Sequence, residues 1–147
     1  MIRRFGKTPE NGQRYRMRPG AYALLPRGGK LLITCQYAPH PDLQLPGGGI
    51  DPGESPIPAL HREVYEETGW KIAAPHKMGV FRRFAYMPEY DLWAEKICHI
   101  YIACPLRRIG PPAEEGHKAL WVTPQEAALR LGNAGDRHFA ARLAARL

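Results

Sequence analysis

Residues 47–70 read GGGIDPGESPIPALHREVYEETGW: three glycines, a turn rich in proline and glycine, and an acidic segment that stops at a glycine. We expect residues 45–54 to be irregular, because they hold too many Gly and Pro residues for a helix or a strand. The pattern predicts a helix over residues 55–68. Ser55 is a suitable N-cap, a proline follows it in the first turn, and Gly69 supplies the left-handed residue that commonly follows a helix.

This helix would gather three carboxylates on one side. Glu63, Glu66 and Glu67 would project within roughly 100° of one another, since a helical turn takes about 3.6 residues. Carboxylates so close repel one another, and no lysine in the segment offsets the repulsion. A hard divalent cation such as Mg²⁺ or Mn²⁺ would turn the repulsion into a binding site. For three glutamates alone, a solvated acidic face is an equally good interpretation.

The flanking residues favour the cation. The glycines at 47–49 lie just before the helix, where backbone without side chains can approach a metal or a phosphate closely. Glu54 and Arg62 flank the helix start, and we expect an ion pair between them that fixes the loop to the helix. An apolar stripe beside the acids would dock the helix: Ile57, Leu60 and Val64.

Outward from this segment, apolar runs separated by turn residues indicate short strands. The expected strands cover residues 21–26, 30–36, 72–87, 93–104 and 119–122. Arg27-Gly28-Gly29 between the first two is a hairpin signal, and residues 37–44 would form a loop. Residues 98–104 alternate between two faces, which is the period of a half-buried strand.

Two further helices follow the last expected strand. Residues 123–126, Thr-Pro-Gln-Glu, would open the first with a capping box. Residues 136–147 carry apolar side chains four apart, as an amphipathic helix does: Phe139, Leu143 and Leu147. Residues 1–20 are polar and basic and would form an arm or an edge. Because no repeat or linker is evident, residues 1–147 are interpreted as one mixed α/β domain.

Composition excludes several classes of protein. A hydrophobic content of 44% in 147 residues is too high for a disordered chain. The formal net charge of +7 favours an anionic ligand. Cys35, Cys98 and Cys104 have no metal-type spacing, lie in apolar stretches and are expected to be buried reduced thiols. No apolar run is long enough for a membrane span, and none follows the basic start as in a signal peptide, so we expect a cytoplasmic protein.

The central segment resembles the Nudix box, the signature of the Nudix hydrolase family. The pattern asks for Gly, five residues, Glu, seven residues, Arg-Glu, a hydrophobic residue, any residue, Glu-Glu, any residue, Gly and a hydrophobic residue. Every spacing is matched over residues 48–70, with Trp70 where an aliphatic residue is usual. The matching residues are Gly48, Glu54, Arg62, Glu63, Val64, Glu66, Glu67, Gly69 and Trp70. Seven fixed residues would coincide at one starting point roughly once in 10⁸ tries at ordinary residue frequencies.

The resemblance implies an α/β/α sandwich around a mixed sheet and a site for Mg²⁺ or Mn²⁺. The implied metal ligands are the side chains of Glu63, Glu66 and Glu67 and a backbone carbonyl of Gly47 or Gly48. One more acid often comes from a loop outside the box in the family. Glu115 resembles that acid in MutT-like members, and Glu114 is its rival.

The activity implied by the resemblance is Mg²⁺-dependent hydrolysis of a pyrophosphate link in a nucleoside diphosphate joined to another group. Metal ions would neutralise developing charge and lower the pKa of the attacking water. A carboxylate would accept the proton, and Glu66 or Glu63 is the candidate base. Arg62 would orient Glu54 rather than contact substrate.

The substrate is less defined by the sequence than the reaction. Nucleoside triphosphates or dinucleoside polyphosphates are favoured, because markers of NADH, coenzyme A and ADP-ribose members are not evident. Tyr86 has a position resembling a tyrosine marker in diadenosine-polyphosphate hydrolases. Asn133 and Asp136 occupy a region similar to the part of MutT-like enzymes that reads the base edge, although an N-cap role explains Asp136 equally well. Arg18 and Arg82, among several arginines, are candidates for gripping phosphates.

Two other functions stay open. A ligand-sensing Nudix-like domain without catalysis is one, but such domains usually lose box glutamates and this chain keeps them. Hydrolysis of the 5′ end of triphosphorylated RNA is the other, motivated by the charge of +7. The arginines define no stripe and no RNA-binding motif is present, so another nucleic-acid partner is not expected. We expect a monomer or a homodimer.

Overall fold

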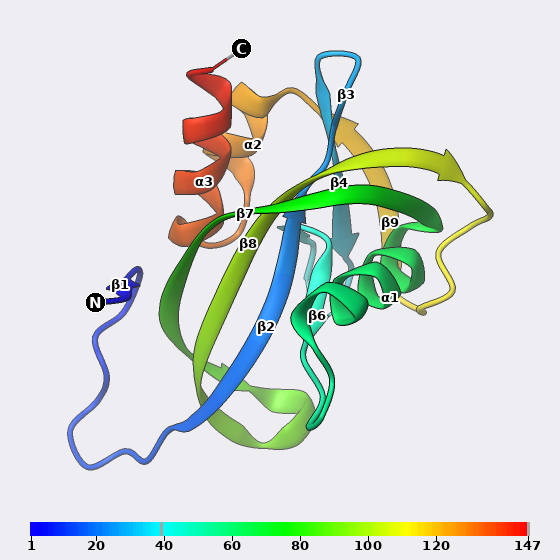
Figure 1. Cartoon of the computed structure of the whole chain (residues 1–147). Helices are drawn as coiled ribbons and strands as arrows, with labels where there is room; N and C mark the ends of the chain where they lie inside the picture. The colour runs from blue at the N-terminus through cyan, green and yellow to red at the C-terminus, as the bar shows by residue number, and fades with distance from the viewer. Residues whose placement is uncertain (39, 147) are drawn as a thin grey trace.

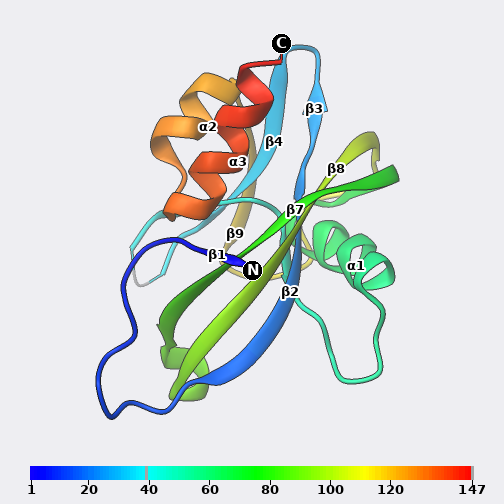
Figure 2. The same ribbon diagram turned by 60° about the vertical axis from the view of Figure 1, so that its left-hand side comes forward.

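The structure, a computed structural model, describes residues 1–38 and 40–146. Two β-sheets lie between helices, with α1 on one side and with α2 and α3 on the other (Figures 1 and 2). The helices are α1 (Pro56–Thr68), α2 (Pro124–Arg130) and α3 (Ala134–Ala144), and a 3₁₀ turn covers Pro88–Tyr90. The strands are β1 (Arg3–Arg4), β2 (Arg16–Leu24), β3 (Pro26–Arg27), β4 (Lys30–Gln36), β5 (Asp42–Gln44), β6 (Gly47–Gly49), β7 (Trp70–Met87), β8 (Leu92–Arg108) and β9 (His117–Val122).

The larger sheet is mixed and has the order β1-β7-β8-β2-β6. Its β1/β7 and β2/β8 pairs are parallel, whereas its β7/β8 and β2/β6 pairs are antiparallel. In the smaller sheet β4 pairs antiparallel with β3, β5 and β9. This arrangement confirms the expected α/β/α sandwich around a mixed sheet.

Two apolar clusters hold the layers together. On the α1 side, Leu60 and Val64 are fully buried and pack with residues of β2 and β8. On the other side, Phe139 and Leu143 of α3 pack with Phe81 of β7. Burial of such side chains stabilises a fold by about 1.5–3 kcal/mol each. The two clusters therefore fix the helices that flank the site.

The helix and hairpin predictions are largely confirmed. Pro26 pairs with Leu31 across a turn at residues 28–29, as the hairpin signal indicated. The capping box at α2 is present, with the Thr123 side chain accepting a hydrogen bond from the Glu126 N–H. The last helix begins at Ala134 rather than at Asp136, and Leu147 lies outside the described residues.

Three segments expected to be irregular contain strands. Residues 16–20 of the basic arm belong to β2, which pairs with β8. Residues 42–44 form β5 and residues 47–49 form β6. The local signal failed here because pairing with distant strands supplies the hydrogen bonds that the Gly- and Pro-rich sequence does not promise.

Three burial predictions were also wrong. Ile57 is 42% exposed, because it lies in the first turn of α1, and Ala59 is buried instead. Cys104 is exposed near the end of β8, although Cys35 and Cys98 are buried and all three thiols are free. Tyr101 of β8 is buried like its neighbour Ile100, because helices cover both faces of this part of the sheet. No helix of the described residues is long and apolar enough to cross a membrane.

Candidate metal and catalytic site

The site is built on α1, whose ends are set by the predicted residues. Ser55 is the N-cap residue in an extended conformation, without a side-chain hydrogen bond. Gly69 ends the helix with φ 77°, where a side chain would be strained, and its N–H donates to the Tyr65 carbonyl at 2.8 Å. Leu60 and Val64 face the core, Glu67 is buried beside them, and Glu63 and Glu66 are half-buried.

The predicted ion pair between Arg62 and Glu54 is confirmed and is bidentate. Arg62 Nε donates to Glu54 Oε2 at 3.0 Å, and Nη2 donates to Oε1 at 2.9 Å. The hydrogen bonds from Arg62 hold the pKa of Glu54 below its ordinary value. The guanidinium also donates to Glu63 at 3.0 Å and lies 3.5 Å from Glu66. Arg62 thus connects the loop before the helix to two of the three box carboxylates.

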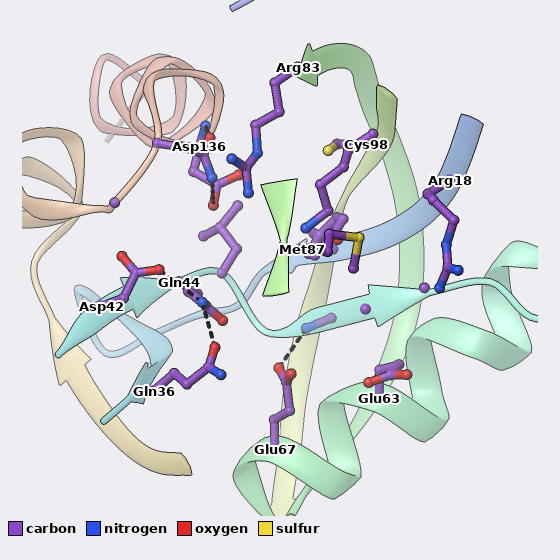
Figure 3. A pocket seen from close by; sticks show the side chains of 18 of the residues that line it. Arg18, Gln36, Asp42, Gln44, Glu63, Glu67, Arg83, Met87, Cys98 and Asp136 are labelled. Carbon is purple, nitrogen blue, oxygen red and sulfur yellow. Dashed lines mark hydrogen bonds between the residues drawn. The ribbon is translucent and has the colours of Figure 1, made fainter. Parts of the chain in front are cut away.

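The glycine segment packs directly against these carboxylates. As Figure 3 shows, the Gly47 N–H donates to Glu67 Oε1, at 3.0 Å. A Cβ atom placed on Gly48 would lie 2.5 Å from the carboxyl carbon of Glu63, closer than real Cβ atoms approach. A side chain at this position would therefore displace the Glu63 carboxylate from strand β6, and glycine lets the two lie in contact.

Burial disfavours the ionised form of two of these groups. It raises the pKa of Glu67 well above its ordinary value, and neighbouring carboxylates raise it further. Burial also raises the pKa of Glu63, against the lowering effect of Arg62. Desolvation of this kind disfavours the charged form of a carboxylate, and a nearby cation favours it. The electrostatics are those of a site that gains from a bound cation.

Of the two acids considered outside the box, Glu114 lies with the box carboxylates and Glu115 does not. Ligand atoms of Glu63, Glu66 and Glu114 lie within 4.8 Å of one another. A second group of the same spread contains Glu67, Glu114 and His117. The Glu114 backbone N–H donates to the Glu66 carbonyl at 2.9 Å, which fixes this loop beside α1. Glu115 belongs to neither group and is exposed.

Glu63, Glu67 and Glu114 line one end of a cleft of about 490 Å³, whereas Glu66 is not among its lining residues. Figure 3 shows Glu63 and Glu67 at one end, with Arg83 and Asp136 at the other. Gln44 lies along one side, where its amide donates to Gln36 at 3.0 Å and to Asp42 at 2.9 Å. The cleft thus has an acidic end and a polar end, and the polar end contains both a basic side chain, Arg83, and an acidic one, Asp136.

The structure brings some predicted substrate residues into the cleft and leaves others out. Arg18, Asn133 and Asp136 line it. Arg82 does not, because its guanidinium donates to Glu95 at 3.0 Å and to the Ile2 carbonyl at 3.3 Å. Tyr86 does not line it either, and its hydroxyl bonds to Asp91.

Asp136 is not the N-cap of α3. Asn133 is, and its side-chain oxygen accepts from the Asp136 N–H at 2.8 Å. The Asp136 carboxyl accepts from Asn133 Nδ2 at 2.9 Å and is buried at the polar end of the cleft. Burial raises the pKa of Asp136 to about 6, although Arg83 and Asn133 act to lower it.

Sequence reasoning did not identify Lys96 and His117, and it named Arg83 only as one of several candidate arginines; all three line the cleft. Strand parity was a usable signal for Arg83, because it shares a strand face with the core residue Phe81 whereas Arg82 does not. Lys96 pairs with Arg83 across β7 and β8, and its pKa is lowered by burial. His117 could not be found from local pattern, since its hydrogen bond to Thr34 at 3.0 Å joins two strands far apart in sequence.

Comparison with known proteins agrees with the family resemblance seen in the sequence. A family model described as NUDIX domain matches residues 14–143. A Bacillus subtilis protein named "Putative 8-oxo-dGTP diphosphatase" is 35% identical over 74 residues, which cover 50% of this chain and 50% of that protein. An RNA pyrophosphohydrolase from Photorhabdus laumondii is 51% identical over 43 residues, 29% of this chain and 24% of that protein. The chain therefore matches half or less of the length of these relatives.

Solved structures agree on the fold. The MutT protein from Methanosarcina mazei has a TM-score of 0.69 at 20% identity, with 92% of this chain and 98% of that chain covered. A mutator MutT protein from Bacillus halodurans has the same TM-score and identity, with 84% and 80% covered. At this level of identity the likeness concerns the fold alone.

Proposed function

The chain belongs to the NUDIX family, and from this premise we propose that it is a divalent-metal-dependent hydrolase of phosphoric anhydrides in nucleotides. The observation that carries the proposal is the gathering of three box carboxylates and Glu114, with Glu63 and Glu67 against a glycine strand. Side chains so arranged repel one another unless a cation lies among them. A solvated acidic face would have no need of glycine at position 48.

The donor set fits a hard divalent cation. Glu63, Glu66 and Glu114 form one group that would hold it, and Glu67 and Glu114 belong to a second. Both groups offer carboxylate oxygens, the ligands that Mg²⁺ and Mn²⁺ prefer. A backbone carbonyl of Gly47 or Gly48, which the resemblance implies as a further ligand, would come from the strand that contacts Glu63 and Glu67. His117 adds a nitrogen donor beside Glu67 and Glu114, which Mn²⁺ accepts more readily than Mg²⁺. A bound cation would neutralise phosphate charge and lower the pKa of a water molecule.

The chain's own residues would supply the general base and position the carboxylates. Glu66 is the proposed general base, because its side-chain carboxylate accepts no hydrogen bond within residues 1–38 and 40–146 and lies 3.5 Å from Arg62. Glu63 and Glu67, by contrast, are held by Arg62 and by the Gly47 N–H. Arg62 is a positioning residue, since it orients Glu63 and Glu54 from behind the cleft.

The polar end of the cleft would hold the nucleoside. Asn133 and Asp136 offer amide and carboxyl groups for the edge of a base, and Arg83 and Lys96 offer positive charge. Arg18 lies nearer the acidic end, where it would contact phosphate (Figure 3). A nucleoside triphosphate or a dinucleoside polyphosphate fits this polarity. The name of the Bacillus subtilis relative supports the triphosphate.

The 5′ end of triphosphorylated RNA is a second candidate substrate. Relatives named RNA pyrophosphohydrolase match this chain at 46–51% identity, each over 43 to 45 residues. The net charge of +7 is compatible with a polyanion.

A substrate panel tests the proposed function. The purified chain is incubated with Mg²⁺ or Mn²⁺ and with nucleoside triphosphates, dinucleoside polyphosphates, nucleotide sugars or 5′-triphosphorylated RNA, and the products are separated. We expect cleavage of a phosphoric anhydride in at least one class. Binding without turnover of any substrate would favour a ligand-sensing domain instead.

A further inference from the structure

A second groove lies beside the cleft, beneath the N-terminal arm. It has a volume of about 520 Å³ and runs between residues 5–15 of the arm, strands β7 and β8, and the start of α3. We call it the arm groove, and the lining residues that matter here are Lys7, Tyr15, Phe84, Tyr86, Trp93 and Arg137. Figures 1 and 2 show the arm as a long loop that leaves β1 and returns to β2.

The arm groove and the cleft adjoin each other and share part of their lining. Arg83, Gly132 and Asn133 line both of them. Arg83 lies at the polar end of the cleft, away from Glu63 and Glu67 of α1 (Figure 3), and Asn133 is hydrogen-bonded to Asp136 at the same end. A ligand that enters the arm groove from the cleft must therefore extend from the nucleoside and not from the phosphate chain.

The lining of the arm groove combines aromatic rings with positive charge. Tyr15 packs edge-on against Phe84 at 4.8 Å, and Tyr86 packs against Trp93 at 5.1 Å, which holds the rings in place. Tyr86 is nevertheless 42% exposed. Lys7, Arg83 and Arg137 line the groove together with a single acid, Glu10. Rings that offer a face and cations that meet phosphate are the combination that binds single-stranded nucleic acid.

We propose that the arm groove binds the nucleotide that follows, on the 3′ side, the nucleoside held in the cleft. The substrate class is then a 5′-polyphosphorylated oligonucleotide, with Arg83 close to the bridging 3′ phosphate and a second base against Tyr86 and Trp93. This inference rests on the proposed function and deepens it. The second nucleoside of a dinucleoside polyphosphate would lie beyond the acidic end and could not reach the arm groove.

The test compares two substrates in the same enzyme preparation. One is a nucleoside triphosphate, and the other is the dinucleotide that carries the same nucleoside at its 5′-triphosphate end. The readout is the ratio of their kcat/KM values, dinucleotide over mononucleotide. We expect a ratio of about ten, the scale of one stacked base. A dinucleoside tetraphosphate serves as the third substrate.

Matched variants assign the effect to the arm groove. Lys7→Glu with Tyr86→Ala alters the groove, and Lys71→Glu with Tyr37→Ala makes the same change in charge and ring number at exposed residues outside it. We expect the ratio to fall to about one in the first double variant, with the loss of the stacked base and its cation, and to persist in the second. Lys7→Glu alone, at an exposed residue of the arm, should lower the ratio without disturbing the fold.

The outcomes separate the two proposals. Hydrolysis of the mononucleotide with a wild-type ratio near one, or with equal ratios in both double variants, would overturn the arm groove and leave the proposed function intact. If the groove variant selectively lost cleavage of the dinucleoside tetraphosphate, that result would also overturn the arm-groove proposal. Failure to cleave any of the three substrates would instead count against the proposed function.

Discussion

Among single residues, Glu66 has the surroundings of a proton acceptor. Its carboxylate is held less tightly than those of Glu63 and Glu67, and one of its oxygens lies beside Arg62 at 3.5 Å. We predict that Glu66→Gln lowers kcat by about 10³-fold, or about 4 kcal/mol of barrier, because the amide cannot accept the proton. Steady-state kinetics with Mg²⁺ measures this, with Glu115→Gln as the matched control. An unchanged rate would remove Glu66 from the catalytic role.

The neighbouring pair Glu114 and Glu115 offers a sharp comparison. Glu114 lies with both groups of possible ligands, whereas Glu115 lies with neither. Glu114→Gln should therefore weaken Mn²⁺ binding by about tenfold, the lower range for loss of one supporting group, and Glu115→Gln should leave it unchanged. Titration calorimetry with Mn²⁺ measures the dissociation constants of both variants. Equal affinities in the two variants would mean that Glu114 holds no metal.

Asp136 gives a prediction about pH. Burial raises its pKa to about 6 from an ordinary value of 3.8, so the folded chain keeps a proton that the unfolded chain releases between these values. The unfolding free energy must then fall as pH rises through this window, by up to about 3 kcal/mol from this group. Asp136→Asn removes the effect. The difference in unfolding free energy between wild type and variant should change by that amount between about pH 4 and pH 7.

Urea titrations at the two pH values, without added metal, provide the measurement. The difference between the two proteins isolates Asp136 from the other buried carboxylates, which contribute to both. A difference that stays constant across the window would show that Asp136 titrates at its ordinary value and is not desolvated in solution.

At this scale the sequence identified residue types better than residue positions. The box carboxylates and the Arg62–Glu54 pair followed from helical spacing, which is local. Arg82 was chosen where the cleft holds Arg83, although strand parity separates them. Nothing local separates Glu114 from Glu115, because loop conformation decides which carboxylate turns towards α1.

Among the elements, α1 carries the site and depends on its buried stripe. Leu60 is fully buried between α1 and the sheets, whereas Ile57 is 42% exposed. Leu60→Ala should destabilise the chain by about 3 kcal/mol through lost burial and a cavity, and Ile57→Ala should change stability by less than about 0.5 kcal/mol. Thermal and urea unfolding of the two variants measure the difference. Similar losses would mean that Ile57 is covered in solution.

Some elements are determined by local sequence and others by contacts with distant segments. The helix over residues 55–68 was predictable because its proline, its spacing and Gly69 all lie within the segment. Strand β6 was not predictable, because Gly47–Gly49 becomes a strand only by pairing with Gly20–Tyr22 of β2. That pairing depends on the tertiary fold, and it is the feature that brings backbone to the Glu63 carboxylate.

For the whole molecule, the layers place two kinds of chemistry in one cleft. Helix α1 supplies carboxylates from one side, and the segment that opens α3 supplies Asn133 and Asp136 from the other. The sheet order β7-β8-β2-β6 sets the space between them and aligns Arg83 and Lys96 along it. A substrate with a polyphosphate at one end and a nucleoside at the other matches this division, and the arm groove extends the nucleoside end.

The central claim is that a divalent cation among the α1 carboxylates is required for hydrolysis. The most direct measurement is the initial rate of nucleotide cleavage with Mg²⁺, after addition of excess chelator, and after restoration of free Mg²⁺. We predict that cleavage stops in chelator and returns with the metal, while the circular dichroism spectrum stays constant. A full rate of cleavage in excess chelator would contradict the account.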